Sequence, residues 1–282
     1  MQAFFMEAVS ALRNMHIPSL PEEVIKLKQE LTAKYPNTVT VANLISRNPE
    51  MYNHFLKLVN SNLTETDEPI QDAQAAVNIL GLDEIFNIFL ASTFSKQIAV
   101  NEVEKEVLRF GALAGIAATE LSPWVGGVSR SEAYLAALSQ NIGAVFLMRL
   151  DREGYADIFF KQLSYPFTAH KKEADLMMTT HAYAGVIVAK KWEMSADIYQ
   201  TILLHHDEMY IGKTANHPKV RHLVALTMMA NYLITVNLGE SFVTQEVKRM
   251  RQLAQRVLTL SDNALKSASR VVLKAKKSAD KI

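Results

Sequence analysis

Apolar residues recur along this chain at the spacing of an α-helix, and this pattern restricts the possible folds more than any other feature. Phe55, Val59 and Leu63 lie at positions i, i+4 and i+8, and the segments 135–146 and 198–203 repeat the same spacing. No run alternates apolar and polar residues over a useful length. Ten glycines and eight prolines in 282 residues are few for the many turns of a sheet-rich protein. We therefore expect an all-α fold.

Prolines and capping residues divide this pattern into successive helices. Pro18 and Pro21 break one helix and open the next, and Asn48 is a suitable cap for a helix that begins at Pro49. The expected helices cover residues 2–14, 21–35, 39–46, 49–62, 69–80, 82–98, 102–121, 130–149, 152–163, 170–192, 195–206, 217–237, 243–258 and 262–280. The segment 99–102 is the predicted boundary between two packed lobes, which are residues 1–100 and residues 101–282.

The composition excludes several classes of function. The chain has no cysteine, which removes disulfides, thiolate catalysis and cysteine-ligated zinc. Its formal charge of +1 gives no broad electrostatic attraction to nucleic acid. The last helix carries six basic residues and one acid between positions 266 and 281, which we interpret as a solvated face, with an anionic partner surface as the alternative.

The sequence shows neither a secretory signal nor an apolar stretch near the roughly 20 residues that span a bilayer. We therefore expect a cytoplasmic protein with no membrane association.

Histidines are the main candidate metal ligands. His181 begins one helical stretch, and His205 and His206 end another about 24 residues later. Imidazoles from two helices suit a divalent metal, but alone they do not hold Mg²⁺ or Mn²⁺, which prefer carboxylate oxygens. Asp207 could supply one carboxylate. The other five histidines are predicted to be ordinary surface or capping residues: His16, His54, His170, His217 and His222.

A set of short motifs occurs in order over residues 17–235. In the first lobe they are Ile17-Pro-Ser-Leu-Pro21, Ser46-Arg-Asn-Pro-Glu-Met51, Leu56-Lys-Leu-Val-Asn-Ser61 and Ala76-Val-Asn-Ile-Leu-Gly-Leu82. In the second they are Ala133-Tyr-Leu-Ala-Ala-Leu-Ser-Gln-Asn-Ile-Gly143, His181-Ala-Tyr-Ala-Gly185 and Ile202-Leu-Leu-His-His206. This ordered set resembles the HDOD family, a bacterial, degenerate branch of the HD superfamily of metal-dependent phosphohydrolases. The resemblance implies that the second lobe is an HD-like helical bundle.

The resemblance also implies which positions should bind metal, and the chain departs from most of them. HD hydrolases use an early His, a His-Asp dyad, later His residues and a final Asp. Here the early position falls in Leu108-Arg-Phe-Gly-Ala112, the dyad is Gln140-Asn141, and the last position is Asn231. Asn and Gln keep approximate shape, but they lack the charge that holds a hard cation and cannot act as a general base. We expect no cofactor and no catalytic residue, and we favour a protein that is not an enzyme.

The residues that remain are predicted to form one polar pocket: Gln140, Asn141, His181, His205, His206 and Asn231. The first interpretation is a hydrogen-bonded polar core that holds helices together. The second is a retained site for a small, nucleotide-like ligand. The third is weak binding of a divalent metal ion through His181, His205, His206 and Asp207.

The function that the resemblance implies is a non-catalytic signal-transduction module that acts through protein or small-ligand binding. The expected partner is a protein in a signalling pathway, docked in a groove between the lobes. A homodimer is compatible with this function, and nucleic acid is not an expected partner. The alternative is a metal-dependent phosphohydrolase acting on a nucleotide or phosphodiester.

Overall fold

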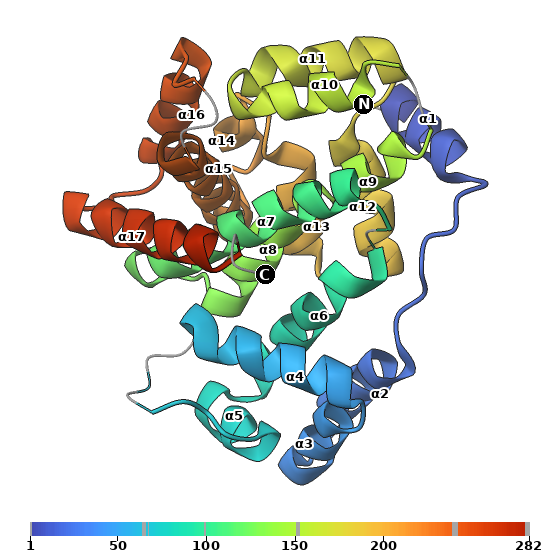
Figure 1. Ribbon diagram of the computed structural model, residues 1–282, viewed down its shortest axis with the longest axis vertical. Helices are drawn as coiled ribbons and strands as arrows, with labels where there is room; N and C mark the ends of the chain where they lie inside the picture. Colours follow the sequence, from blue (N-terminus) through green and yellow to red (C-terminus); the bar gives the residue numbers. More distant parts are fainter. Residues whose placement is uncertain are drawn as a thin grey trace.

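A computed structural model of the chain describes residues 2–63, 66, 68–98, 100–150, 153–238 and 242–279. Among these residues every regular element is a helix (Figure 1). The prediction of an all-α fold is confirmed. Within the described part of the chain, no helix has the length and apolar character needed to cross a membrane.

Three of the first six helices, α3, α4 and α5, begin after residues whose side chains cap them, which are Asn37, Asn48 and Asp72. Asn48 accepts backbone N–H bonds from Glu50 and Met51 at 3.1 and 3.2 Å, as expected from its position before Pro49. The elements are α1 (Gln2–Leu12), α2 (Glu22–Leu31), α3 (Thr38–Ser46), α4 (Pro49–Leu58), the π-helical turn η1 (Val59–Leu63), α5 (Ala73–Leu80) and α6 (Leu82–Ile98).

The remaining helices form a bundle around α7, α8 and α15 (Figure 1). They are α7 (Glu102–Leu121), η2 (Ser122–Trp124), α8 (Arg130–Ser139), α9 (Ile142–Met148), α10 (Tyr155–Phe160), η3 (Lys161–Leu163), α11 (Pro166–Met177), α12 (His181–Lys191), α13 (Ala196–Leu204), α14 (Tyr210–Lys213), α15 (Pro218–Leu238), α16 (Gln245–Gln255) and α17 (Asp262–Ala279).

Two helices that the sequence predicts as continuous are each broken in two. The expected helix 130–149 is interrupted between Ser139 and Ile142, and the expected helix 170–192 is interrupted after Met177, where Met178 adopts a left-handed φ of 55°. Neither break contains Pro or Gly, so the usual sequence signals of a helix end are absent. Both breaks lie beside the candidate site described below.

Helices α9 and α12 approach each other so closely that glycine is required at the contact. A Cβ atom on Gly143 would lie 2.0 Å from the carbonyl oxygen of His181 and 2.4 Å from the backbone nitrogen of Gly185. No side chain fits at that separation. The approach fixes the start of α12, and therefore His181, against the break between α8 and α9.

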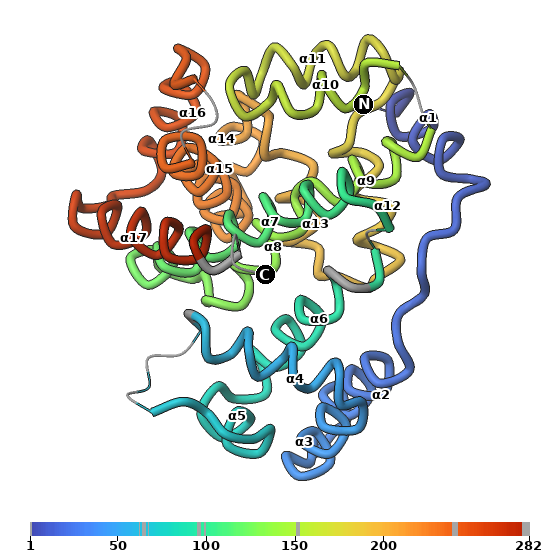
Figure 2. The backbone as a smooth tube through the Cα atoms, in the orientation of Figure 1, coloured from blue at the N-terminus to red at the C-terminus, as the bar shows by residue number. Residues whose placement is uncertain are grey.

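Helices α2–α5 gather at one end of the molecule, α6 leads from them to the bundle, and α1 lies at the far end (Figures 1 and 2). Helix α1 packs on α12: Phe4 stacks on Tyr183 with ring centroids 5.6 Å apart, and Thr179 Oγ1 donates to the Phe4 carbonyl oxygen at 2.8 Å. The sequence-based division at residue 100 stays a prediction, since Ala99 lies outside the described residues.

Two buried contacts tie the α2–α6 end to the bundle. Trp192 is fully buried, packs edge-on against Phe94 at 5.3 Å, and donates its Nε1–H to the carbonyl oxygen of Pro18 at 3.0 Å. Arg149 donates to both carboxylate oxygens of the buried Glu104, at 3.0 and 2.9 Å, and also to the carbonyl oxygen of Ile98. These bonds join the end of α6, the start of α7 and the end of α9.

Candidate functional site

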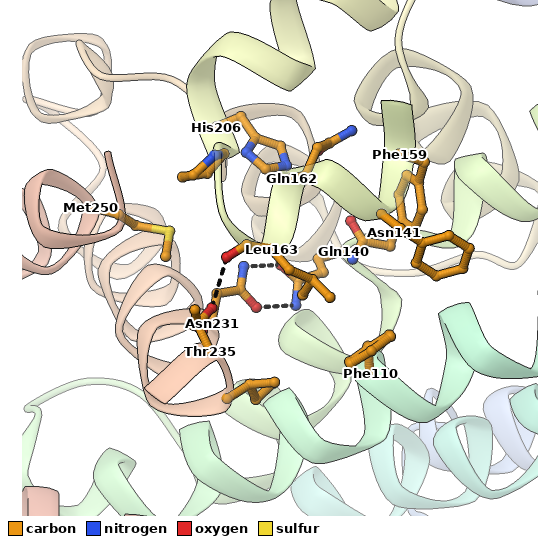
Figure 3. Close-up of a pocket in the computed structure, with 13 residues that line it drawn as sticks. Phe110, Gln140, Asn141, Phe159, Gln162, Leu163, His206, Asn231, Thr235 and Met250 are labelled. Carbon is orange, nitrogen blue, oxygen red and sulfur yellow. Dashed lines mark hydrogen bonds between the residues drawn. The ribbon is translucent and has the colours of Figure 1, made fainter. Parts of the chain in front are cut away.

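Gln140 and Asn231 form a reciprocal pair of amide hydrogen bonds between the end of α8 and the middle of α15. Gln140 Nε2 donates to Asn231 Oδ1 at 2.9 Å, and Asn231 Nδ2 donates to Gln140 Oε1 at 2.7 Å (Figure 3). Gln140 also donates to the Ala137 carbonyl oxygen at 3.0 Å, and it is 1% exposed. A neutral cross-link therefore joins the two helices here.

Four histidine rings from three segments of the chain pack against one another beside this pair. His170 lies on α11, His181 is the first residue of α12, and His205 and His206 follow α13. The centroid separations are 4.6 Å for His170–His206, 5.1 Å for His181–His206 and 4.2 Å for His205–His206. The structure thus brings together the three histidines of the predicted pocket and adds His170, whose interpretation as an ordinary surface or capping residue was wrong.

Helix α11 is held over the pocket from its N-terminus by a residue of another helix. Glu246 of α16 accepts the backbone N–H groups of Phe167 and Thr168 at 2.9 and 3.0 Å. These are orphan donors of the first helical turn, and a carboxylate there also interacts favourably with the helix dipole. This contact helps to hold His170 against the other histidine rings. No local sequence pattern indicates that placement.

Glu173 is the carboxylate of the cluster, and sequence reasoning missed it. It is fully buried, and its Oε1 accepts from Tyr155 Oη at 2.9 Å and from the His181 backbone N–H at 2.8 Å. Its Oε2 accepts from His181 Nδ1 at 2.7 Å and from Gln162 Nε2 at 3.3 Å, and lies 3.3 Å from His170 Nδ1. The spacing of three residues between His170 and Glu173 is the one signal that could have found it.

The surroundings of Glu173 decide its charge. Burial raises the pKa of this carboxyl group, but the charge of His181 and hydrogen bonds from His170 and His181 outweigh burial and hold the pKa well below its usual value. The opposite holds for the neighbouring rings. Burial, followed by the nearby histidines, depresses the pKa of His205 and of His206 well below the usual range, and burial lowers that of His170. The surroundings thus favour an ionised Glu173 beside uncharged rings at His170, His205 and His206.

A small cavity of about 40 Å³ is lined by the amide pair and by His206 (Figure 3). Its wall is mainly apolar and includes Phe110, the residue near the expected early histidine. Polar atoms of Asn141, Gln162 and His206 belong to its lining, and Asn141 Oδ1, Gln162 Oε1 and His206 Nδ1 are buried without a hydrogen-bond partner. Gln162 must present its oxygen there, because its nitrogen donates to Glu173. The described polar lining is thus rich in acceptors.

The donor set does not fit the hard catalytic cation that HD hydrolases use. Mg²⁺ and Mn²⁺ need several oxygen ligands, preferably carboxylates. Glu173 already accepts several hydrogen bonds and is not among the residues that line the cavity. Asp207 points elsewhere: it pairs with Lys213 and accepts the Met209 backbone N–H at 2.8 Å. The nitrogen donors are suitable only for a softer metal.

Comparisons with known proteins agree with the fold and the motifs. The family model of the HDOD domain matches residues 17–208. An HDOD domain protein of unknown function from Geobacter sulfurreducens has a solved structure with a TM-score of 0.71 and 19% identity, covering 99% of this chain and 98% of that one. A proposed metal-dependent phosphohydrolase from Shewanella amazonensis has a TM-score of 0.67 and 19% identity, covering 98% and 99% of the two chains. At these identities the likeness to the structures shows the fold alone.

An uncharacterised protein of Treponema pallidum is 22% identical over 227 residues, which is 80% of this chain but 43% of that protein. The matched region is therefore less than half of that relative's length.

Proposed function

The chain belongs to the HDOD domain family, and from this premise we propose that it is a non-catalytic regulatory module that acts by binding a protein partner in a signalling pathway. The observation that carries this proposal is the amide pair Gln140–Asn231. The resemblance to HD hydrolases assigns these two residues to the positions of the dyad histidine and of the final aspartate. Each amide uses its partner's donor and acceptor. These two side chains hold helices together and supply no anionic ligand.

The cavity also lacks the groups that hydrolysis requires. Of the described residues that line it, His206 is the one titratable group. A hydrolytic centre activates water through a metal with open coordination positions and a general base, in a site that aligns both with the substrate. Asn141 and Phe110 cannot supply either function.

The size of the cavity favours a protein partner over a small ligand. Sites for drug-sized ligands measure roughly 300–1,000 Å³. A cavity of about 40 Å³ has room for a few water molecules and none for a nucleotide. Binding of a nucleotide-like signal would require α10 or α11 to move.

Hydrolysis assays with a matched variant test this proposal. The wild-type chain is incubated with Mg²⁺, Mn²⁺ or Fe²⁺ and a panel of nucleotides, cyclic dinucleotides and an activated phosphodiester. We expect no metal-dependent turnover. The matched variant is the triple substitution Gln140→His, Asn141→Asp and Asn231→Asp, which restores the missing ligand types. We expect Mn²⁺ to raise the melting temperature of this variant more than that of the wild type.

The alternative is a metal-dependent phosphohydrolase, which His170, His181 and His206 favour because these three residues could hold a metal ion. Metal-dependent turnover by the wild-type chain, abolished by His181→Gln, would establish that alternative and overturn the proposal.

A further inference from the structure

We propose that His170, His181 and His206 form a binding site for a borderline divalent cation of the Zn²⁺ type, which ties α11 to α12 and to the segment after α13. One ring nitrogen from each residue lies within 4.8 Å of the others. With Zn–N distances of about 2.0–2.1 Å, the nitrogens of a tetrahedral site are about 3.3 Å apart, so the rings need to close by about 1.5 Å at most. This closure is within reach of side-chain rotation.

In many metal sites a carboxylate that does not bind the metal itself accepts a hydrogen bond from a ligating histidine, and Glu173 is in that position. It accepts the Nδ1–H of His181 at 2.7 Å, which fixes the ring tautomer and leaves Nε2 for a metal. It also lies 3.3 Å from His170 Nδ1. Glu173 thus orients His181 by a hydrogen bond and lies beside His170.

His205 lies beside the proposed site. Its Nδ1 donates to the Ile202 carbonyl oxygen at 2.7 Å, and its Nε2 lies 3.2 Å from His181 Nε2. A metal ion on His181 Nε2 would displace this contact between the two rings.

The same features select the kind of metal. Neutral imidazoles suit Zn²⁺, Ni²⁺, Co²⁺ and Cu²⁺, whereas Mg²⁺ and Mn²⁺ prefer oxygen. The unpartnered oxygens of Asn141 and Gln162 lie in the cavity that His206 also lines, and they can accept hydrogen bonds from a water on the cation. The ligand set differs from that of the HD hydrolytic centre, because it includes His170 and lacks the early His, the His-Asp dyad and the final Asp.

Titration with Zn²⁺ tests the site directly. The full chain, without a polyhistidine tag and freed of metal, is titrated in competition with a chromophoric chelator. We expect one Zn²⁺ per chain, an affinity at least about 100-fold lower in His170→Gln and in His206→Gln, and a loss of about 10-fold to 100-fold in Glu173→Gln. His222→Gln, whose ring contacts the Gly126 carbonyl oxygen on the surface, is the control and should bind as the wild type does.

Absence of stoichiometric binding by the wild type would overturn the proposal, and so would binding that His170→Gln leaves unchanged. Circular dichroism shows whether each variant folds, and the wild-type titration decides even where a variant does not. The outcome is separable from the proposed function: Zn²⁺ binding without turnover supports both, binding with turnover overturns only the non-catalytic function, and neither binding nor turnover overturns only this site.

Discussion

The amide pair of Gln140 and Asn231 should make a measurable coupled contribution to stability. We consider Gln140→Met and Asn231→Leu, singly and together, since these changes keep side-chain size while removing hydrogen bonding. Asn231→Leu leaves the Gln140 oxygen unpaired at a position that is 1% exposed, which should cost about 2–3 kcal/mol. Gln140→Met leaves both polar atoms of Asn231 unpaired, but water in the adjacent cavity can reach them, so we expect about 1–2 kcal/mol.

The double variant separates the pair from its surroundings. Two net hydrogen bonds of about 1 kcal/mol each predict a coupling energy of about 2 kcal/mol, so the double variant should be less destabilised than the sum of the single ones. Urea unfolding, followed by both tryptophan fluorescence and circular dichroism, gives these free energies where the two transitions coincide. A coupling below about 0.5 kcal/mol would refute the role of this pair as a cross-link.

Three further predictions concern the frame around the site. Gly143→Ala should destabilise the fold by about 3 kcal/mol or prevent folding, because the new Cβ would lie 2.0 Å from the His181 carbonyl oxygen. Thermal melting compares it with Gly126→Ala, where nothing lies within 4 Å, and equal melting temperatures would contradict the close approach. Arg149→Met should cost about 3 kcal/mol in urea unfolding, because it leaves the buried Glu104 carboxylate without its cation. A loss below about 1 kcal/mol would show that the ion pair does not hold this junction. Burial raises the pKa of Glu104, but Arg149, the Val100 backbone N–H and the Asn101 side chain outweigh burial and lower the pKa from 4.5. The stabilising effect of Glu104 is therefore complete above that pH and is lost as the pH falls through the folded-state pKa. The difference in unfolding free energy between the wild type and Glu104→Gln should therefore be constant between about pH 6 and 8 and shrink in acid, and a difference that grows in acid would contradict the assignment.

The sequence predicts the helices well where local chemistry decides them. Apolar spacing identifies α7 and α15, and Asn48 caps α4 where the Asn-Pro pair indicates. It fails at the two breaks beside the site. Gln140 ends α8 with helical backbone angles, and its side chain bonds with Asn231, which is 91 residues away. Met178 adopts a left-handed conformation in a segment with no glycine or proline. No local sequence signal marks either break.

Only part of the candidate site can be predicted from the sequence. The resemblance to the HDOD family identifies Gln140, Asn231 and His181 as members of one pocket, and the structure brings them together with His205 and His206. His170 and Glu173 could not be placed, because their position depends on the break after Met177 and on Glu246 of α16. A polar residue on an amphipathic helix carries no local sign that another helix will bury it.

Turnover by metal-loaded protein tests the central claim most directly. The wild-type chain, loaded in turn with Mn²⁺, Fe²⁺ and Zn²⁺, is assayed for release of nucleotide or phosphate from phosphodiesters and nucleotides. The account predicts rates equal to those of metal and substrate alone, even where Zn²⁺ is bound at one ion per chain. Metal-dependent turnover that His181→Gln abolishes and His222→Gln preserves would contradict it.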